Sequence, residues 1–317
     1  MKIVLLDSLT VNPGDLSWDA IAKLGEFTWY ESTPKELRAE RIGDAEAALV
    51  NKTHLDRATI EACPNLRYIG LFATGYNIVD VGAARERGIP VTNVPGYSTA
   101  AVAQHTLALL LEITNQVGWH DARVKEGMWS RDPEFAYRDM SLVELAGLTL
   151  GVIGYGGIGR AFARIAVAMG MKVVAYRKNT SVPPDPGVEY AALDTILTES
   201  DVVSLHVPLL PDTERMINGR SLSLMKRGAI LVNSSRGGLI DDNAVAAALR
   251  DGKLAAYGAD VASVEPVSSD NPLLGAPRCI LTPHIAWAPK ATRKRLMERV
   301  AENLSAFQAG CPVNVVN

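Results

Sequence analysis

The sequence predicts an α/β protein with two doubly wound parallel-sheet domains, and three observations support this prediction. Short apolar runs alternate with helical patterns from the first residues onward, as strands and helices do in parallel sheets. A glycine-rich turn, GYGGIG at 154–159, lies in mid-chain between a strand pattern and a helix pattern. The chain has 317 residues, which is enough for two domains of about 150 residues each.

The first 97 residues alternate between strand and helix patterns. Continuous apolar runs predict buried parallel strands at 2–6 (KIVLL), 47–50 (AALV) and 68–73 (YIGLFA). Amphipathic stretches between and after these runs predict helices at 16–25, 55–63 and 79–88. We therefore expect a complete α/β layer before any nucleotide motif appears in the chain.

A second sheet is predicted in the middle of the chain. After a turn at 93–97, a long helix is expected at 100–114, with Ser98 or Thr99 as its cap. Strand patterns then follow at 148–154, 173–177, 202–207, 229–235, 255–261 and 278–284, and a last amphipathic helix at 290–307. Because the glycine turn lies in mid-chain, we expect a dinucleotide-binding domain at 98–286, inserted into a substrate-binding domain formed by 1–97 and 287–317.

The glycine turn follows one strand pattern and opens a helix, as dinucleotide-binding turns do. In such a turn Gly154 allows the tight bend, Gly156 lets the backbone approach a pyrophosphate, and Gly159 lets helix and strand pack closely. The helix N-terminus, with Gly157 and Ile158, supplies N–H groups and a partial positive charge for phosphates. An ordinary tight strand-to-helix turn is the alternative.

The next strand pattern ends in Arg177 and Lys178, where dinucleotide-binding units usually carry an acidic residue for the ribose hydroxyls. No acidic residue occurs between Met171 and Pro184. Arg177, Lys178 and Asn179 are donors that predict a site for a 2′-phosphate, and hence NADPH, with Arg177 dominant and Lys178 solvated. A solvated cationic turn that still accepts NADH is the alternative.

Three residues fit the chemistry of hydride transfer to a 2-keto acid. Arg236, after the strand pattern at 229–235, can bond a carboxylate and a ketone oxygen with its planar fork. His284, at the end of the last strand pattern, is a proton donor suited to neutral pH. Glu265 can hydrogen-bond that histidine and hold its tautomer. Taken singly, these residues have structural alternatives: a surface arginine, a half-buried histidine and a loop carboxylate.

Seven segments together resemble the D-2-hydroxyacid dehydrogenase family. They occur in the family's order and spacing: ATGYNIVD, NVPGYSTAAVAQH, GYGGIG, HVPLLPDT, NSSRGGLIDD, GADVASVEP and LTPHIAWA. The resemblance covers nearly the whole chain. The opening LDSLTVNPGDLSWD, the NKT at 51–53 and the tryptophan of HIAWA are most similar to the glycerate dehydrogenase, or hydroxypyruvate reductase, group. The chain departs from the family pattern at Gln104 and at Arg177, where NAD-dependent members carry Asp.

The resemblance implies a Rossmann dinucleotide-binding domain inserted into a flavodoxin-like substrate-binding domain. It implies catalytic roles for Arg236, Glu265 and His284, and a contact between Asp260 and the nicotinamide carboxamide. Further cofactor contacts are implied at His206, Val207, Pro208, Thr213, Ser234, Ser235 and Ala286. Substrate contacts are implied at Asn51, Lys52, Thr74, Gly75, Tyr76 and Trp287. Family members are usually homodimers, with the helix from Ala100 onward expected at the contact.

Composition argues against several other classes of protein. The formal net charge is −3 and no basic run occurs, so neither nucleic acid nor a membrane surface is indicated as a partner. The three cysteines, Cys63, Cys279 and Cys311, are scattered and form no CxxC pair. Neither a disulfide framework nor a metal site is therefore indicated, and a cytoplasmic location fits best.

The sequence thus predicts an NADPH-preferring reductase of small 2-keto acids, hydroxypyruvate and glyoxylate first, with His284 as general acid and D-2-hydroxy acids as products. NADH is kept as a second cofactor. Two alternatives stay open: a related dehydrogenase of a larger substrate, and a dinucleotide-sensing, corepressor-like binding protein. Turnover of NADPH with hydroxypyruvate would separate the enzyme from the binding protein.

Overall fold

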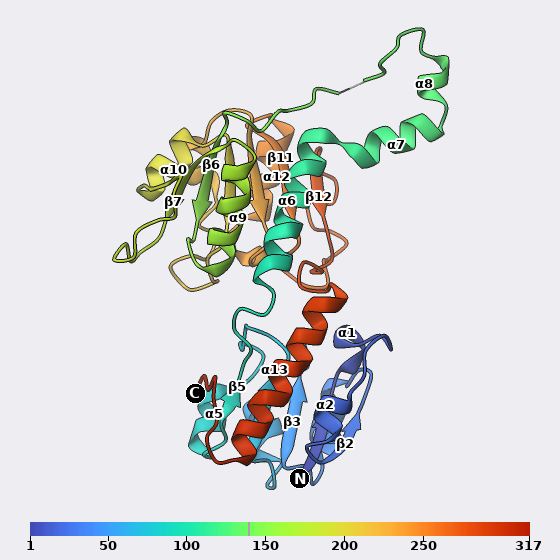
Figure 1. The fold of residues 1–317 in the computed structure, drawn as a ribbon, viewed down its shortest axis with the longest axis vertical. Coiled ribbons are helices and arrows are strands. Elements are labelled where there is room, and N and C mark those ends of the chain that lie inside the picture. Colours follow the sequence, from blue (N-terminus) through green and yellow to red (C-terminus); the bar gives the residue numbers. More distant parts are fainter. Residues whose placement is uncertain (139) are drawn as a thin grey trace. The chain divides into compact units, whose positions relative to one another are not determined.

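The computed structural model describes residues 1–138 and 140–317, which fold into two compact units (Figure 1). Unit 1 is formed by Met1–Ser98 together with Trp287–Asn317, and unit 2 is the intervening Thr99–Ala286. Each unit has its own parallel sheet and its own hydrophobic cores.

Unit 1 is built on a five-stranded parallel sheet. Its strands are β1 (Lys2–Leu5), β2 (Glu26–Trp29), β3 (Ala47–Val50), β4 (Tyr68–Leu71) and β5 (Val91–Thr92), in the order β2-β1-β3-β4-β5. This is the flavodoxin-like order of a doubly wound sheet. The apolar runs predicted β1, β3 and β4. The edge strands β2 and β5 were missed, because β2 is largely exposed and β5 has only two residues.

Short helices and one long helix complete unit 1. They are α1 (Ser8–Val11), α2 (Asp19–Ala22), α3 (Arg38–Ile42), α4 (Arg57–Glu61), α5 (Val81–Glu86) and α13 (Lys290–Gln308), with a 3₁₀ turn η1 (Lys35–Leu37). The side chains of Asp56 and Asp80 cap α4 and α5 by accepting backbone N–H groups three residues ahead. The C-terminal α13 buries Leu296, Val300 and Leu304 in the core of this unit, so the last segment of the chain packs on the N-terminal sheet.

Unit 2 is built on a seven-stranded parallel sheet. Its strands are β6 (Thr149–Ile153), β7 (Lys172–Tyr176), β8 (Val188–Tyr190), β9 (Val202–Leu205), β10 (Ala229–Asn233), β11 (Leu254–Ala259) and β12 (Cys279–Leu281). Their order is β12-β11-β10-β9-β6-β7-β8, which is the Rossmann arrangement with one added strand. The strand order reverses between β6 and β9, and ligands of such sheets bind at this switch point. The short β8 was the one strand of this sheet that the sequence patterns missed.

Helices cover both faces of this sheet. They are α6 (Thr99–Asn115), α7 (Val117–Lys125), α8 (Met128–Arg131), α9 (Gly157–Ala168), α10 (Leu193–Glu199), α11 (Gly219–Leu224) and α12 (Asp242–Arg250), with a 3₁₀ turn η2 (Gly237–Leu239). One core joins α6 and α9 to the sheet through Leu109 and Phe162, and a second joins α10, α11 and α12 through Leu197, Leu222 and Val245. Among the described residues, none of the helices combines the length and the apolar character that a bilayer crossing requires.

Candidate active site

The glycine turn between β6 and α9 has the shape of a phosphate-binding site. A Cβ at Gly154, where φ is +101°, would lie 2.4 Å from the carbonyl oxygen of His206, and one at Gly159 would lie 2.1 Å from that of Gly154. These two glycines are therefore required for the turn itself. A Cβ at Gly156 would meet nothing within 4 Å, so the space in front of this backbone is open to a ligand. The first turn of α9, with Gly157 and Ile158, supplies N–H groups for a pyrophosphate.

The end of β7 carries the two cations that the sequence singled out. Lys178 is mostly exposed, as expected, but its ammonium forms an ion pair with Asp212 in the loop after β9. Arg177, partly buried, has no hydrogen bond or ion pair within the described ranges 1–138 and 140–317. Asn179 accepts the N–H of Ser181 at 2.8 Å, so its side-chain oxygen shapes the turn. Of the two cations, Arg177 is the one whose charge remains available to a phosphate.

The loop after β9 is held by its own side chains. Thr213 donates its hydroxyl to Pro208 O at 2.7 Å and accepts the N–H of Leu210 at 2.8 Å, which closes the segment that begins at Val207. His206 lies at the switch point, with its Nε2 2.9 Å from Ser204 Oγ. Burial lowers the pKa of His206 to about 4, so the ring is neutral at pH 7 and can accept the serine hydroxyl. This histidine is therefore suited to lining a site and not to proton donation.

A buried asparagine holds the backbone of the Arg236 turn. Asn233, the last residue of β10, accepts the N–H of Ser235 at 3.0 Å and donates to Arg236 O at 2.9 Å. Ser235 donates its hydroxyl to Leu205 O at 2.8 Å, which ties the turn to β9. The Arg236 guanidinium donates to Ser235 O at 2.7 Å and stays exposed at the carboxyl edge of the sheet.

Gly237 brings the Arg236 turn against the loop that carries Glu265. A Cβ at Gly237 would lie 1.9 Å from the carbonyl carbon of Ala262, so any side chain there would force the two loops apart. Ala262 N donates to Glu265 Oε1 at 3.1 Å, and Glu265 Oε2 lies 2.7 Å from His284 Nδ1. The three predicted catalytic residues therefore come from the ends of the adjacent strands β10, β11 and β12.

His284 is held in an orientation that suits proton transfer. Its backbone is left-handed, with φ of +56°, and its N–H donates to Thr282 O at 3.0 Å. Because Nδ1 faces the Glu265 carboxylate, the Nδ1 proton points to that oxygen and Nε2 is the nitrogen that can exchange a proton with a substrate. A positive φ is uncommon for a residue other than glycine, and such conformations cluster at functional sites.

Asp260 organises the loop that contains His284. Its carboxylate is buried and accepts Thr282 Oγ1–H at 2.6 Å, Ile285 N–H at 2.9 Å and Ala286 N–H at 2.7 Å. The contact between Asp260 and a nicotinamide carboxamide stays a prediction. His105, which the sequence analysis did not single out, lies with its Nε2 2.9 Å from Thr282 Oγ1. The one sequence feature that could have indicated its role is that His105 is a polar residue within the apolar pattern of α6.

In unit 1, the predicted substrate residues other than Trp287 follow the carboxyl ends of β3 and β4. Asp7, after β1, accepts the N–H groups of Asn51 at 2.8 Å and Thr53 at 2.6 Å, and also that of Lys52. Burial raises the pKa of Asp7, and these three hydrogen bonds oppose that rise. Asp7 was missed as the residue that shapes the NKT segment, although a carboxylate at the end of the first strand was visible in the sequence.

The predicted substrate residues differ in how they are presented. The buried Asn51 side chain donates to Phe72 O at 2.6 Å and accepts Thr10 Oγ1–H at 2.9 Å, so its amide serves the fold of unit 1. Thr74 donates its hydroxyl to Val94 O at 2.8 Å, next to Gly75. Lys52 and Tyr76 are exposed, whereas Trp287 is buried in the core of unit 1. Substrate contact by these residues, including a size-limiting role of Trp287, stays a prediction.

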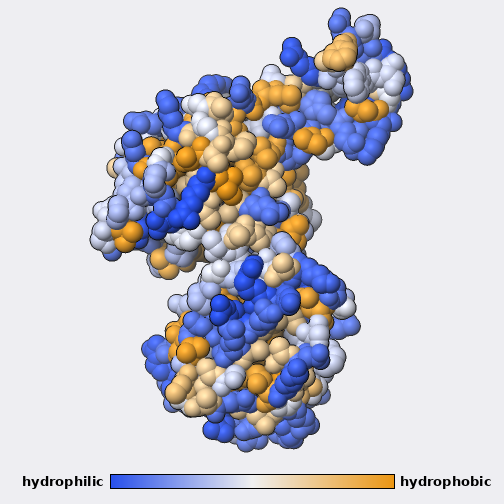
Figure 2. All heavy atoms as spheres, in the orientation of Figure 1, coloured by the Kyte–Doolittle hydropathy of each residue, from blue (hydrophilic) through white to orange (hydrophobic). Residues whose placement is uncertain are grey.

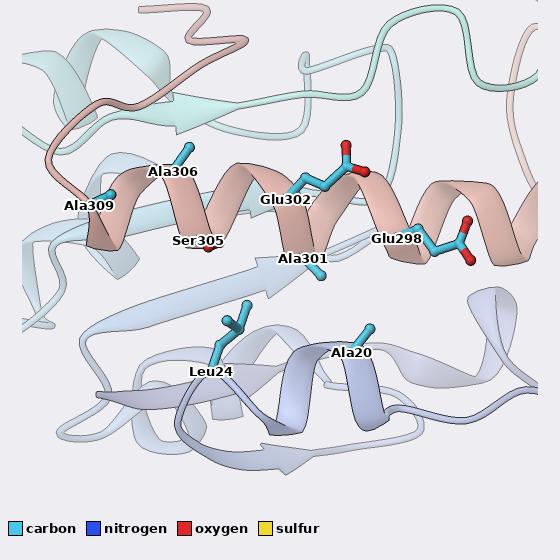
Figure 3. Close-up of a pocket in the computed structure, with 8 residues that line it drawn as sticks. All are labelled: Ala20, Leu24, Glu298, Ala301, Glu302, Ser305, Ala306 and Ala309. Carbon is cyan, nitrogen blue, oxygen red and sulfur yellow. The ribbon is translucent and has the colours of Figure 1, made fainter.

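Unit 1 also contains a shallow groove between α2 and α13 (Figure 3). It contains none of the predicted site residues. The groove is lined by Ala20, Leu24, Glu298, Ala301, Glu302, Ser305, Ala306 and Ala309.

A phosphate-binding turn at the switch point of a parallel sheet, with a carboxylate–histidine pair at neighbouring strand ends, is typical of a dinucleotide-dependent oxidoreductase. Residues 107–286 match the family model of the D-isomer specific 2-hydroxyacid dehydrogenase NAD-binding domain. The chain belongs to the D-2-hydroxyacid dehydrogenase family, and a nicotinamide dinucleotide is its cofactor.

Known proteins that are similar to this chain include named enzymes and solved structures. The chain is 50% identical over 322 residues to hydroxypyruvate reductase of Blautia hydrogenotrophica, covering 100% of both chains. It is 40% identical to glycerate dehydrogenase of Methylorubrum extorquens, covering 99% of this chain and 98% of the relative. Among solved structures, an acyclic imino acid reductase (Bsp5) in complex with NADPH and D-Arg has a TM-score of 0.88 at 32% identity, with 100% of both chains covered. The sequence-based expectation of the family is therefore confirmed.

Proposed function

We propose that the protein is an NADPH-preferring reductase that converts small 2-keto acids, hydroxypyruvate and glyoxylate first, to D-2-hydroxy acids. The observation that carries this proposal is the 2.7 Å contact between His284 Nδ1 and Glu265 Oε2, next to the turn that presents Arg236. Relatives named hydroxypyruvate reductase, glycerate dehydrogenase and glyoxylate reductase support the substrate class.

The three residues divide the chemistry among themselves. Arg236 binds the carboxylate and polarises the ketone of the substrate with its planar fork. The ring of His284 donates the Nε2 proton to the oxygen that becomes the hydroxyl, and Glu265 holds the ring through Nδ1. The reduced nicotinamide supplies the hydride when it is bound. The turn at 154–159 and Asp260 are the parts of unit 2 that would hold this cofactor.

The preference for NADPH rests on Arg177. Its guanidinium is not engaged by any carboxylate in the part of the chain that the structure describes, whereas Lys178 is paired with Asp212. A 2′-phosphate is the anionic partner that a cation at the end of the second strand accommodates. The proposed protein is cytoplasmic and acts on small molecules as a homodimer, for which the exposed apolar side chains of α7 and α8 offer the contact.

The test is a panel of keto acids, each assayed with NADH and with NADPH. The panel contains glyoxylate, hydroxypyruvate, pyruvate and a branched 2-keto acid, and the chirality of each product is determined. We expect the highest kcat/KM for hydroxypyruvate or glyoxylate with NADPH, and a D-product from hydroxypyruvate. A higher kcat/KM for the branched 2-keto acid would show that the proposed substrate class is wrong. A higher kcat/KM with NADH would overturn the proposed role of Arg177.

A further inference from the structure

Two consecutive residues of helix α6 contact both loops that carry catalytic side chains. His105 Nε2 lies 2.9 Å from Thr282 Oγ1, at the start of the loop that contains His284. Thr106 Oγ1 lies 2.7 Å from Ser234 Oγ, at the start of the turn that contains Arg236. Neighbouring residues of a helix point about 100° apart. One helix turn can therefore reach two different loops of the same sheet edge.

The contact of His105 continues to the backbone around His284. Thr282 donates its hydroxyl to Asp260 Oδ1 at 2.6 Å, and His105 Nε2 itself lies 3.4 Å from the same oxygen. The Asp260 carboxylate in turn accepts the N–H groups of Ile285 and Ala286. The Thr282 hydroxyl and the buried Asp260 carboxylate thus connect the imidazole of His105 to the backbone amides that follow His284.

The contact of Thr106 with Ser234 lies only two residues along the chain from Arg236. Thr106 is fully buried and also donates to Val102 O at 2.8 Å, so its hydroxyl is fixed by the helix before it meets Ser234. Ser234 is followed by Ser235, which is tied to β9, and then by Arg236. Helix α6 packs on β10, which leads into the Arg236 turn, and on β11, which pairs with the β12 strand that leads into the His284 loop.

We propose that His105 and Thr106 are positioning residues that hold the Arg236 turn and the His284 loop at a fixed separation. The catalytic purpose of this fixed separation rests on the proposed function, in which Arg236 and His284 bind the same substrate molecule. Hydride and proton transfer need reacting groups placed to within a fraction of an ångström, and a small displacement costs much of the rate. Neither residue needs to touch the substrate or the cofactor for this role.

Helix α6 offers a matched control for the test. Thr114, also fully buried on α6, donates to Leu110 O at 3.0 Å as Thr106 does to Val102 O, but its hydroxyl contacts with described residues lie within the helix and its end. Thr106→Val and Thr114→Val therefore remove the same helical hydrogen bond, and only the first removes a contact with a catalytic turn. We expect kcat to fall about threefold to tenfold in Thr106→Val at little change in KM, and to be retained in Thr106→Ser. Thr114→Val should keep the wild-type kcat.

His105 is tested in the same way, with His105→Leu as the disruptive variant and His105→Gln as the variant that keeps a donor. Hydrogen exchange gives a readout that does not depend on turnover. We expect faster exchange of the Ile285 and Ala286 amides in His105→Leu, and of the Ser235 amide in Thr106→Val, with neither change in Thr114→Val. Equal losses of kcat in Thr106→Val and Thr114→Val, or unchanged exchange of these amides, would overturn the proposal. Wild-type protein inactive on all keto acids would refute the proposed function, and amide exchange would then decide by itself whether the two residues hold the loops.

Discussion

The contacts around His284 and Glu265 show how a few atoms orient the proposed proton donor of this protein. The left-handed backbone at His284 and the carboxylate at Nδ1 orient the ring, and the loop itself is held by the Asp260 carboxylate. Removing the imidazole takes away the proton donor and its contact with Glu265, but leaves the hydrogen bonds of Asp260 to the loop backbone in place. The consequences of substitution should therefore appear in catalysis more than in folding.

We expect His284→Ala to lower kcat for keto-acid reduction by about 10²–10⁴-fold, the usual contribution of general acid catalysis. Glu265→Gln keeps a hydrogen-bonding group but removes the carboxylate that holds the Nδ1 proton, so kcat should fall, though by less than in His284→Ala. The measurement is kcat and kcat/KM of both variants. A kcat of Glu265→Gln equal to that of the wild type would show that the carboxylate does not orient the donor.

Arg177→Asp tests cofactor choice at the end of β7. A hydrogen bond to a charged group contributes about 1.5–3 kcal/mol, so loss of Arg177 alone should weaken NADPH binding by roughly tenfold to a hundredfold. The aspartate should add repulsion of the 2′-phosphate and give NADH a ribose partner. Lys172→Asp, on the exposed start of the same strand, is the control with the same charge change. The measurement is the ratio of kcat/KM with NADPH to kcat/KM with NADH in each variant. The same ratio in Arg177→Asp and Lys172→Asp would contradict a specific role of Arg177 in cofactor choice.

Lys178→Ala should change cofactor preference less than Arg177→Asp, because Asp212 already neutralises Lys178. The remaining effect of Lys178 should weaken as salt is added, since the ammonium is exposed.

His206 predicts a pH dependence of stability. Because burial lowers its pKa to about 4, the unfolded chain binds a proton between pH 6.5 and 4 that the folded chain does not bind. Stability from this group is therefore fully present above pH 6.5 and falls as the pH drops toward 4, by at most about 1.4 kcal/mol per pH unit. Urea unfolding of His206→Gln at pH 7, 6 and 5 should show a shallower loss than the wild type. His54→Gln, at an exposed histidine, is the control, and equal slopes in all three proteins would refute the prediction.

At the scale of elements, α7 and α8 differ from the other helices of unit 2. Figure 1 shows them projecting from the sheet, and Figure 2 shows hydrophobic side chains among hydrophilic ones on their surface. Val117, Trp119, Trp129 and Phe135 are exposed, the last at 93%. Helix α6, which was expected at a subunit contact, buries Leu109, Leu110 and Ile113 in the core of unit 2, and its part in such a contact stays a prediction.

We expect the segment from α7 to residue 135 to form the homodimer contact, because exposed aromatic side chains gain most from burial in a second copy. The double substitution Trp119→Glu with Trp129→Glu should shift the protein from dimer to monomer in sedimentation velocity. Trp29→Glu, at a similarly exposed tryptophan of β2 in unit 1, should leave the dimer intact. A wild-type monomer, or a dimer that survives the double substitution, would exclude this segment as the contact.

At the scale of the whole molecule, the two units have separate hydrophobic cores, and the predicted cofactor residues all belong to unit 2. A ligand stabilises the state that binds it, by about 2.7 kcal/mol at a concentration of 100 times Kd. NADPH should therefore slow hydrogen exchange in the core strands β6, β9 and β10 and change β1, β3 and β4 much less. Equal protection in both sheets would show that the units unfold as one.

Much of this architecture could be derived from the sequence, because its features are local. Continuous apolar runs identified the central strands β1, β3, β4, β6, β9 and β10, and strand-ending motifs identified Arg236, Glu265 and His284. Glycines such as Gly154 could be assigned a role because the tight turn that they permit depends on the backbone alone. Exposed and very short strands, such as β2 and β8, lacked that apolar signature and were missed.

What only the tertiary structure decided are the partners of polar side chains that lie far apart in the chain. The pairing of Lys178 with Asp212, the support of Lys52 by Asp7 and the contact of His105 with Thr282 all join residues at least 34 positions apart. The periodicity of the sequence does not predict such pairs, because they form only when folding brings separate strands and helices together. The sequence by itself determined the family and the fold class and predicted the reacting groups, whereas the tertiary structure decided which residues hold those groups in place.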